Sequence, residues 1–388
     1  MTALIDLKGK FESKAFVTGI ALAETGRSVE RTTLDLALDA SICAISDAGL
    51  SPDDIDGMAF MSYGELPPSL IADNLGLSLE WMGPGGAGAQ LGVMITAAMA
   101  VASGLCRHVL IFRSVHGLGG LLNTPSHSAG LPGPEGALEY QVPFHEYSAA
   151  HLVAMQARRH MHQYGTTKEQ LGWVAVTSRY HAGFNEQAVY RTPMTIDDYL
   201  AAPLISDPLG RLDCDFPIDG ACAMVISRYD VAKDTRHRPI CFEAVGCANR
   251  TGPFTWNARL DGSATAATDA AAQLWRRTGL TPGDVDAAML YDGFSYLTLT
   301  WLEALGFCGE GEAGSYVEGG ARIQLGGDLP LNTYGGQLSA GRLHGFWLFH
   351  EAVLQLRGDA GLRQVVDAEV IVASAGGAHN CGVVLLTR

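Results

Sequence analysis

The spacing of apolar and polar positions predicts alternating strands and helices along the whole chain. Short apolar runs typical of buried strands lie at 15–22, 108–114, 220–228, 240–248, 287–290 and 368–374. Apolar residues recur with helical spacing at 32–48, 89–103, 264–277 and 346–357, and again from Phe294 onward. Strands that alternate with helices are typical of mostly parallel, buried sheets. The pattern therefore predicts an α/β fold.

One segment of the chain occurs twice. Residues 49–60, GLSPDDIDGMAF, align with residues 279–290, GLTPGDVDAAML, so that a glycine, a leucine, a proline and two aspartates coincide. Each copy follows a predicted helix and precedes a predicted strand. We therefore expect two related α/β halves, an N-terminal half at 1–238 and a C-terminal half at 239–388.

The first half carries a long insertion at about 116–206. It begins with the glycine- and proline-rich stretch GLGGLLNTPSHSAGLPGPEG and continues into the helical pattern YSAAHLVAMQARRHMHQYG. An insertion of this length after a strand is typical of a lid or a substrate-facing loop region.

Composition and charge narrow the classes of function. The chain has 388 residues, of which 47% are hydrophobic and 17% charged, enough to fill two cores or one large layered core. The formal charge of −15 argues against a nucleic-acid partner, because such binding depends on lysine and arginine. No apolar run approaches the ~20 residues of a membrane span, and the N-terminal stretch lacks a signal-peptide pattern. We expect a cytoplasmic protein.

Metal and disulfide sites are not indicated. The eight cysteines include no C-x-x-C pair, and we interpret them as reduced, mostly buried residues. His160 and His162 are two positions apart and do not share a face of a helix. Asp213, Asp215 and Asp219 precede a strand and are expected to anchor a turn, with a calcium site as the less favoured alternative.

Three glycine-rich segments are candidates for ligand contacts. GPGGAGAQLG at 83–92 contains the dinucleotide spacing, but no clear strand precedes it and no acid follows ~20 residues later. We interpret it as a turn whose free N–H groups face an oxygen or an anion. SAGGAHNCG at 374–382 brings the N–H groups of Gly376 and Gly377 into a similar position, unless it is a plain turn between strands.

The third segment faces an unusual strand end. The apolar run 287–290 ends in Tyr291-Asp292-Gly293, and the glycine-rich stretch 329–356 carries Arg342 and His344. A tyrosine and an acid at the end of a buried strand, opposite a loop with two basic side chains, are candidates for acid–base chemistry.

These motifs resemble the thiolase superfamily over essentially the whole chain, and the sterol carrier protein thiolase branch most of all. The stretch 291–294 is similar to the His-Asp-x-Phe motif of that branch. The stretch 332–345 is similar to N-x-x-G-G-x-x-x-x-G-H-P-x-G, and 374–377 resembles the C-terminal C-x-G-G turn. The resemblance implies a thiolase fold, with two βαβαβ-type halves packed as α-β-α-β-α layers.

The departures from the thiolase pattern indicate different chemistry. Ala87 lies near the position of the nucleophilic cysteine, Arg342 replaces the histidine of Gly-His-Pro, and Ser374 replaces the last cysteine. An acyl-enzyme route needs an activated thiol. The same departures are similar to those of the thiolase-like aldolases that shorten steroid side chains, although that subgroup generally has a second tyrosine at the position of Arg342.

The resemblance to this subgroup implies a retro-aldol carbon–carbon lyase. Such an enzyme splits a β-hydroxyacyl-CoA with a steroid or similar side chain into a ketone and a shorter acyl-CoA, such as propionyl-CoA or acetyl-CoA, without a cysteine nucleophile. The expected catalytic residues are Tyr291, Arg342 and His344, where the two basic residues would favour the tyrosine's phenolate. The expected thioester-binding residues are Gly88, Gly376 and Gly377, and the expected supporting residues are Asp292, Asn332, Gly335 and Gly336. No cofactor is expected beyond the coenzyme A of the substrate.

The resemblance also implies partners and leaves alternatives. It implies a homodimer flanked by a separate OB-fold, acyl-CoA-associated protein, which together form a heterotetramer. One alternative is a catalytically silent relative that binds acyl-CoA or a lipid, or that acts as a scaffold. A second is thiolase-type acyl transfer through another nucleophile such as Ser374. Steroid, bile-acid and aryl acyl groups all remain open.

Overall fold

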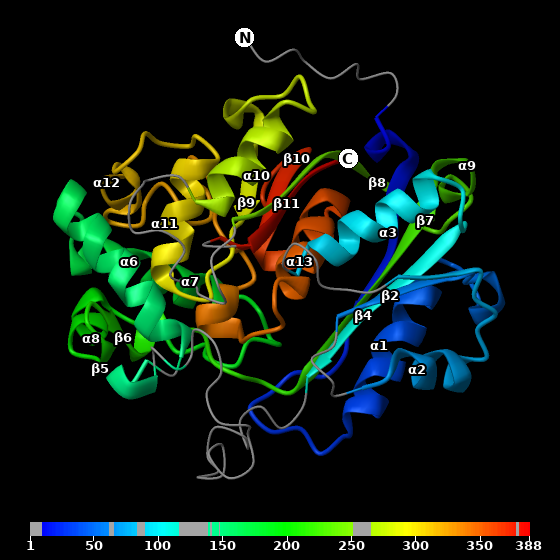
Figure 1. The fold of residues 1–388 in the computed structure, drawn as a ribbon, viewed down its shortest axis with the longest axis horizontal. Coiled ribbons are helices and arrows are strands. Elements are labelled where there is room, and N and C mark those ends of the chain that lie inside the picture. The colour runs from blue at the N-terminus through cyan, green and yellow to red at the C-terminus, as the bar shows by residue number, and fades with distance from the viewer. Residues whose placement is uncertain are drawn as a thin grey trace.

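A nine-stranded mixed sheet runs through the molecule (Figure 1). The computed structural model describes residues 10–61, 66–83, 90–115, 139, 142–146, 148–250, 265–377 and 380–388. The strand order is β3-β2-β4-β7-β1-β8-β11-β10-β9. The strands are β1 (Ala15–Leu22), β2 (Gly57–Phe60), β3 (Trp81–Gly83), β4 (His108–Val115), β7 (Gly220–Arg228), β8 (Ile240–Asn249), β9 (Ala287–Met289), β10 (Val370–Gly376) and β11 (Asn380–Thr387).

The strand order is symmetric about the pair β1–β8, with equivalent strands of the two halves at equal distances from it. Outward from this pair, β1 is followed by β7, β4 and β2, and β8 by β11, β10 and β9. In each half the first two of these pairings are antiparallel and the third is parallel. A bridge between Ala288 and Leu331 takes the place that β3 has in the first half. The repeated sequence therefore corresponds to a repeated topology.

The two halves join through a short contact between β1 and β8. Phe16 pairs with Cys241 and Val17 with Ile240, in antiparallel orientation. An antiparallel contact is the arrangement that an approximate two-fold relation between the halves requires. The predicted boundary at 238/239 falls just before β8, and it stays a prediction.

The expectation of mostly parallel strands is wrong. Parallel pairs occur at β3–β2, β2–β4 and β10–β9, whereas the pairs around the centre of the sheet are antiparallel. Strands buried on both faces give the same unbroken apolar run in either direction, so the hydrophobic pattern carries no information on strand direction.

The helices pack on both faces of each half of the sheet. They are α1 (Thr33–Asp47), α2 (Pro68–Leu75), α3 (Gly92–Ala102), α6 (Ala149–Tyr164), α7 (Lys168–Ala182), α8 (Ile196–Leu200), α9 (Tyr229–Ala232), α10 (Ala266–Trp275), α11 (Ser295–Ala304), α12 (Ala313–Val317) and α13 (Phe346–Arg357). Helix α1 packs on first-half strands and α10 on second-half strands, at opposite sides of the molecule in Figure 1.

Helices α3 and α13 form the central layer. Helix α3 contacts the first-half strands and also β8 and β11, while α13 contacts the second-half strands and also β1 and β7. Helix α3 is almost wholly apolar, and both helices are buried on nearly all sides, as expected for helices enclosed by strands on two faces. The predicted α/β fold with α-β-α-β-α layers is therefore confirmed.

The repeated aspartates satisfy backbone groups at equivalent places in the two halves. Asp56 Oδ1 accepts the N–H groups of Arg107 and His108, both at 2.8 Å, where β4 begins. Asp286 Oδ2 accepts two N–H groups where β10 begins, at 2.8 and 2.9 Å. The two aspartates thus play the same part in the two halves, each accepting two backbone N–H groups at the start of a strand.

The predicted insertion is described in part. Helices α6, α7 and α8 lie in it, and α7 packs against the glycine-rich segment 336–340 and against α11 and α12. Among the residues that the structure describes, no helix has the length and apolar character needed to cross a membrane.

Candidate functional site

Tyr291 lies directly after β9, where the chain turns toward α11. Its side chain is 4% exposed, and its backbone N–H donates to Ser374 Oγ at 3.1 Å. The tyrosine ring folds back over Gly293, where a β-carbon would lie 2.8 Å from Cε1 and 3.2 Å from the phenolic oxygen. The glycine is therefore needed because the tyrosine ring fills the space that a side chain would take.

Asp292 links the strand end to the glycine-rich loop. Its fully buried carboxylate accepts the backbone N–H groups of Gln337 at 3.0 Å and Leu338 at 3.4 Å. Gly336 has a φ of +61°, and a β-carbon there would lie 2.0 Å from Asp292 Oδ2. Burial raises the pKa of Asp292 to about 7, although the two amides oppose the shift. The carboxylate and the glycine thus fix this loop together.

Asn332 and Thr333 fix the loop from the other side. Asn332 has a φ of +47°, and its Nδ2 donates to the carbonyl oxygen of Leu290 at 2.8 Å. Thr333 Oγ1 donates to Glu351 Oε1 at 2.8 Å, and the buried Glu351 carboxylate is paired with Arg363. Asn332 therefore reaches the residue before Tyr291, and its supporting role stays a prediction.

Helix α7 of the insertion packs directly on the same loop. A β-carbon at Gly335, whose φ is +109°, would lie 2.6 Å from Ala182 Cβ at the end of α7. Asn185 Nδ2 donates to the carbonyl oxygen of Tyr334 at 2.8 Å. Part of the insertion therefore packs against one side of the glycine-rich loop.

Arg342 is held by a segment that the sequence did not point to. Its Nη1 lies 3.1 Å from Asp215 Oδ1, and its backbone N–H donates to the carbonyl oxygen of Phe216 at 3.1 Å. The N–H of Asp215 in turn donates to the carbonyl oxygen of Gly293 at 3.0 Å. Asp215 is far from Tyr291 and Arg342 in sequence, and the only signal for it was its place among three aspartates before a strand.

His344 is a neutral side chain in this environment. It is partly buried, has a φ of +52°, and lies on the same loop as Arg342. Burial lowers its pKa well below the ordinary value for histidine, and the positive charges of Arg113 and Arg342 lower it further. Burial and the two arginines thus disfavour a charge on His344, so Arg342 is the cation of this pair, and the catalytic role of His344 stays a prediction.

The predicted thioester-binding glycines lie at the end of β10 or outside the described residues. The carbonyl oxygen of Gly376 accepts Trp301 Nε1–H at 2.9 Å, and the N–H of Gly377 donates to the carbonyl oxygen of Asn380 at 3.1 Å. Gly88 and Ala87 lie outside the described residues. The thioester-binding roles stay predictions.

The other aspartates of the sequence analysis anchor turns, as expected. Asp213 is fully buried and accepts hydrogen bonds from the N–H of Gly210 and from the side chains of Lys168, Tyr199 and Ser295. Asp219 Oδ2 accepts the N–H of Val29 at 3.0 Å. These contacts fix the chain on both sides of Asp215.

His160 and His162 point in different directions, also as expected. His160 is buried and lies 3.0 Å from Glu303 Oε1, whereas His162 is exposed. The two histidines therefore do not lie on one face of the helix.

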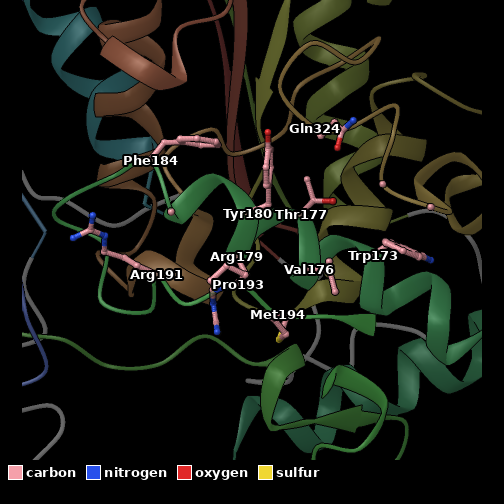
Figure 2. Close-up of a pocket in the computed structure, with 13 residues that line it drawn as sticks. Trp173, Val176, Thr177, Arg179, Tyr180, Phe184, Arg191, Pro193, Met194 and Gln324 are labelled. Carbon is pink, nitrogen blue, oxygen red and sulfur yellow. The ribbon is translucent and has the colours of Figure 1, made fainter. Parts of the chain in front are cut away.

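A cavity of about 430 Å³ lies on another face of α7 (Figure 2). It is lined mainly by apolar and aromatic side chains, including Trp173, Tyr180, Phe184 and Met194. Arg179 also lines it and donates through Nε to Ser339 Oγ, at 2.9 Å, in the glycine-rich loop. None of the predicted site residues lines this cavity, which is a neighbour of the loop.

Known proteins share both the sequence and the fold. The family model described as thiolase C-terminal domain-like matches residues 254–387. A 17-hydroxy-3-oxo-4-pregnene-20-carboxyl-CoA lyase from Mycobacterium tuberculosis is 36% identical, over 96% of this chain and 99% of that protein. A steroid side-chain-cleaving aldolase from Thermomonospora curvata is 34% identical, over 96% of this chain and 97% of that protein.

A solved structure gives the same result. The structure of an Ltp2-ChsH2(DUF35) aldolase has a TM-score of 0.89 and 33% identity to this chain, and the match covers 98% of this chain and 99% of that one. By full-length sequence similarity and by fold, this chain belongs to the thiolase superfamily, in the branch that contains the steroid side-chain-cleaving aldolases.

Proposed function

We propose that this protein is a retro-aldol lyase that cleaves a β-hydroxyacyl-CoA into a ketone and a shorter acyl-CoA. The observation that carries the proposal is the tyrosine at the end of β9, whose ring packs against Gly293 and whose neighbour Asp292 is hydrogen-bonded to the loop that carries Arg342. Full-length relatives named as a carboxyl-CoA lyase and an aldolase support the same reaction.

The reaction needs a base and a group that stabilises an enolate. A base removes the proton from the β-hydroxyl, the bond between the α- and β-carbons breaks, and its electron pair forms the enolate of the thioester while the ketone leaves. The α-carbon of the enolate then takes up a proton, which completes the shorter acyl-CoA and balances the one removed by the base. We assign the base to Tyr291. A phenol ordinarily has a pKa of about 10, so its phenolate needs a nearby cation, and Arg342 is the one that the loop supplies.

The remaining roles follow from position. His344, neutral and on the same loop, would contribute a hydrogen bond and no charge. Gly88, Gly376 and Gly377 would receive the thioester oxygen, which requires the N–H of Gly377 to exchange its bond to Asn380 for one to the ligand. No cofactor is proposed beyond the coenzyme A of the substrate.

We also propose a homodimer that binds a separate OB-fold protein to give a heterotetramer. The name of the similar solved structure, an Ltp2-ChsH2(DUF35) aldolase, includes a DUF35 component, and this supports the proposed partner. Strand β3 is at the edge of the sheet, and Met82 in it is 45% exposed. Such an edge can pair with the same strand of a second copy.

A cleavage assay tests the proposal. The purified protein, with and without the OB-fold partner, is incubated with a steroidal β-hydroxyacyl-CoA, and ketone and acyl-CoA products are followed by mass spectrometry. Tyr291→Phe should lose activity by at least ~10²-fold, because one acid–base group typically contributes that much. Tyr296→Phe, on the neighbouring helix α11, should retain activity.

The opposite result favours a different function. If wild type binds acyl-CoA but releases no product with steroid, bile-acid or aryl substrates, the protein is a binding or scaffold relative. Activity retained by Tyr291→Phe would remove Tyr291 from the mechanism.

A further inference from the structure

We propose that Asp215 is a positioning residue of the active site, which holds the Arg342 guanidinium so that the two side chains act as one unit beside Tyr291. This inference rests on the function proposed above for Tyr291 and Arg342. It adds a residue of the N-terminal half, between the insertion and β7, to proposed catalytic residues that all belong to the C-terminal half.

The backbone of the segment 214–217 connects the two loops of the site. At one end the N–H of Asp215 donates to the carbonyl oxygen of Gly293, beside the tyrosine. At the other end the carbonyl oxygen of Phe216 accepts the N–H of Arg342. Bridges of Cys214 with Phe294 and of Pro217 with Arg342 extend both contacts. The segment therefore fixes the distance between the strand end and the glycine-rich loop.

The side chains of Asp215 and Arg342 form a second connection, an ion pair. The Asp215 side chain is 6% exposed and the Arg342 side chain 27%, and the two meet at 3.1 Å. A guanidinium keeps its charge at every relevant pH, so within this pair only the carboxylate can change state. Removing one partner from a buried ion pair leaves an uncompensated charge, which is costly. Asp215 thus controls how Arg342 is held.

Other titratable groups lie near Asp215 on each neighbouring element. Asp292 at the strand end and Tyr334 on the glycine-rich loop are both affected by the charge of Asp215, as is the thiol of Cys214. Burial raises the pKa of Asp215 to about 6, with Arg342 opposing the shift, and that of Asp292 to about 7. As the pH drops through about 6, Asp215 takes up a proton, and the negative charge that it sets against Arg342 is lost. Activity should therefore fall as the pH drops through about 6.

A double-mutant cycle tests the pair as a unit. Asp215→Asn and Arg342→Gln are made singly and together, and kcat/KM is measured from pH 5 to 9 in the cleavage assay. Each single variant should lose up to about 100-fold, because a displaced group near the reacting atoms costs this much. The double variant should lose no more than the worse single variant, since neither side chain works without the other.

The pH profile separates positioning from simple support of the fold. Asp215→Asn should lose the part of the acidic limb that Asp215 adds near pH 6 and keep the part set by ionisation of the Tyr291 base, whereas a purely structural role would leave the whole pH profile in place. Asp219→Asn is the matched control, because Asp219 is also buried, lies in the same stretch, and anchors the N–H of Val29. It should lower the thermal stability and keep the acidic limb.

Two failures can be told apart. If wild type cleaves the substrate and Asp215→Asn matches it in rate and pH profile, this inference is wrong and the proposed function stands. Additive losses in the double variant would also overturn it. If wild type cleaves none of the β-hydroxyacyl-CoA substrates, the proposed function fails, and this inference fails with it.

Discussion

The two halves of the chain share a scaffold and differ at the ends of their matching strands. Asp56 and Asp286 accept the same kind of backbone N–H pair in the two halves. Strand β2 is followed by the apolar Met61, whereas β9 is followed by Leu290 and then by Tyr291 and a buried acid. Side chains that accept backbone N–H groups are thus present in both copies, and the acid–base side chains are found where the copies differ.

Replacing Gly336, in the glycine-rich loop of the C-terminal half, should have the largest effect on cleavage. Gly336→Ala places a β-carbon 2.0 Å from Asp292 Oδ2, at a φ of +61°. We expect the loop to move and cleavage to fall by at least ~10²-fold, because small displacements of a site cost this much. Gly76→Ala in the first half is the control, since its φ is +68° and no atom lies within 4 Å of the added carbon. It should cost about 1 kcal/mol and leave activity unchanged. Equal losses in the two variants would show that strain alone, without the clash, explains the effect.

Replacing the shared aspartates should destabilise both halves, and the first half more. Asp56→Ala leaves the buried N–H of His108 without its acceptor and removes the pair with the Arg107 side chain, which should cost about 3 kcal/mol of unfolding free energy. Asp286→Ala should cost about 1 kcal/mol, because the N–H of Glu369 is exposed and can bond to water. Urea unfolding measures both, and activity per folded molecule should not change. A neutral result for either variant would contradict the equivalence of the halves.

The scaffold could be predicted from the sequence because its signals are local. The repeat, the strand positions and the helices follow from apolar spacing and from one twelve-residue motif. The strand Gly220–Arg228 and the helix Phe346–Arg357 have the predicted bounds. Strand direction could not be predicted, because it depends on which strands pair and not on how each one is patterned.

The site was predictable only in part, for a related reason. Tyr291 and Arg342 belong to recognisable motifs, but the partner of Arg342 lies at Asp215, a residue whose role depends on a long-range contact. The neutral state of His344 depends on burial and on two arginines, one of which, Arg113, comes from the other half of the chain. Contacts of this kind leave no local pattern.

Protonation should give opposite pH responses in the two halves, with a moderate effect. Burial raises the pKa of Asp292 to about 7, above its unfolded value of about 4, so its contribution to stability is present below pH 4 and lost as the pH rises through 7. Wild type should therefore lose stability relative to Asp292→Asn as the pH rises from 4 to 8.

Asp56 gives the matching test in the first half. Burial alone would raise its pKa, but the hydrogen bonds from His108 and Arg107 outweigh this and lower it. Its contribution is present above its unfolded pKa of about 4 and lost as the pH falls further. Asp56→Asn should therefore cost most at neutral pH. Urea unfolding across pH measures both variants, and two responses of the same sign would contradict the contrast.

Ser374→Ala should have the smallest effect, although Ser374 stands where the thiolase pattern has a cysteine. Ser374 is fully buried in β10, and its Oγ accepts the backbone N–H of Tyr291. If this bond only helps to place the tyrosine, its loss costs about 1 kcal/mol and less than about tenfold in cleavage rate. If Ser374 were the nucleophile of an acyl transfer, activity would fall by several orders of magnitude and an acyl-enzyme would form in wild type. Rapid-quench mass spectrometry of the intact protein detects that adduct. Its presence would replace the tyrosine-based lyase with thiolase-type chemistry, whereas a small loss without an adduct assigns Ser374 to the support of Tyr291.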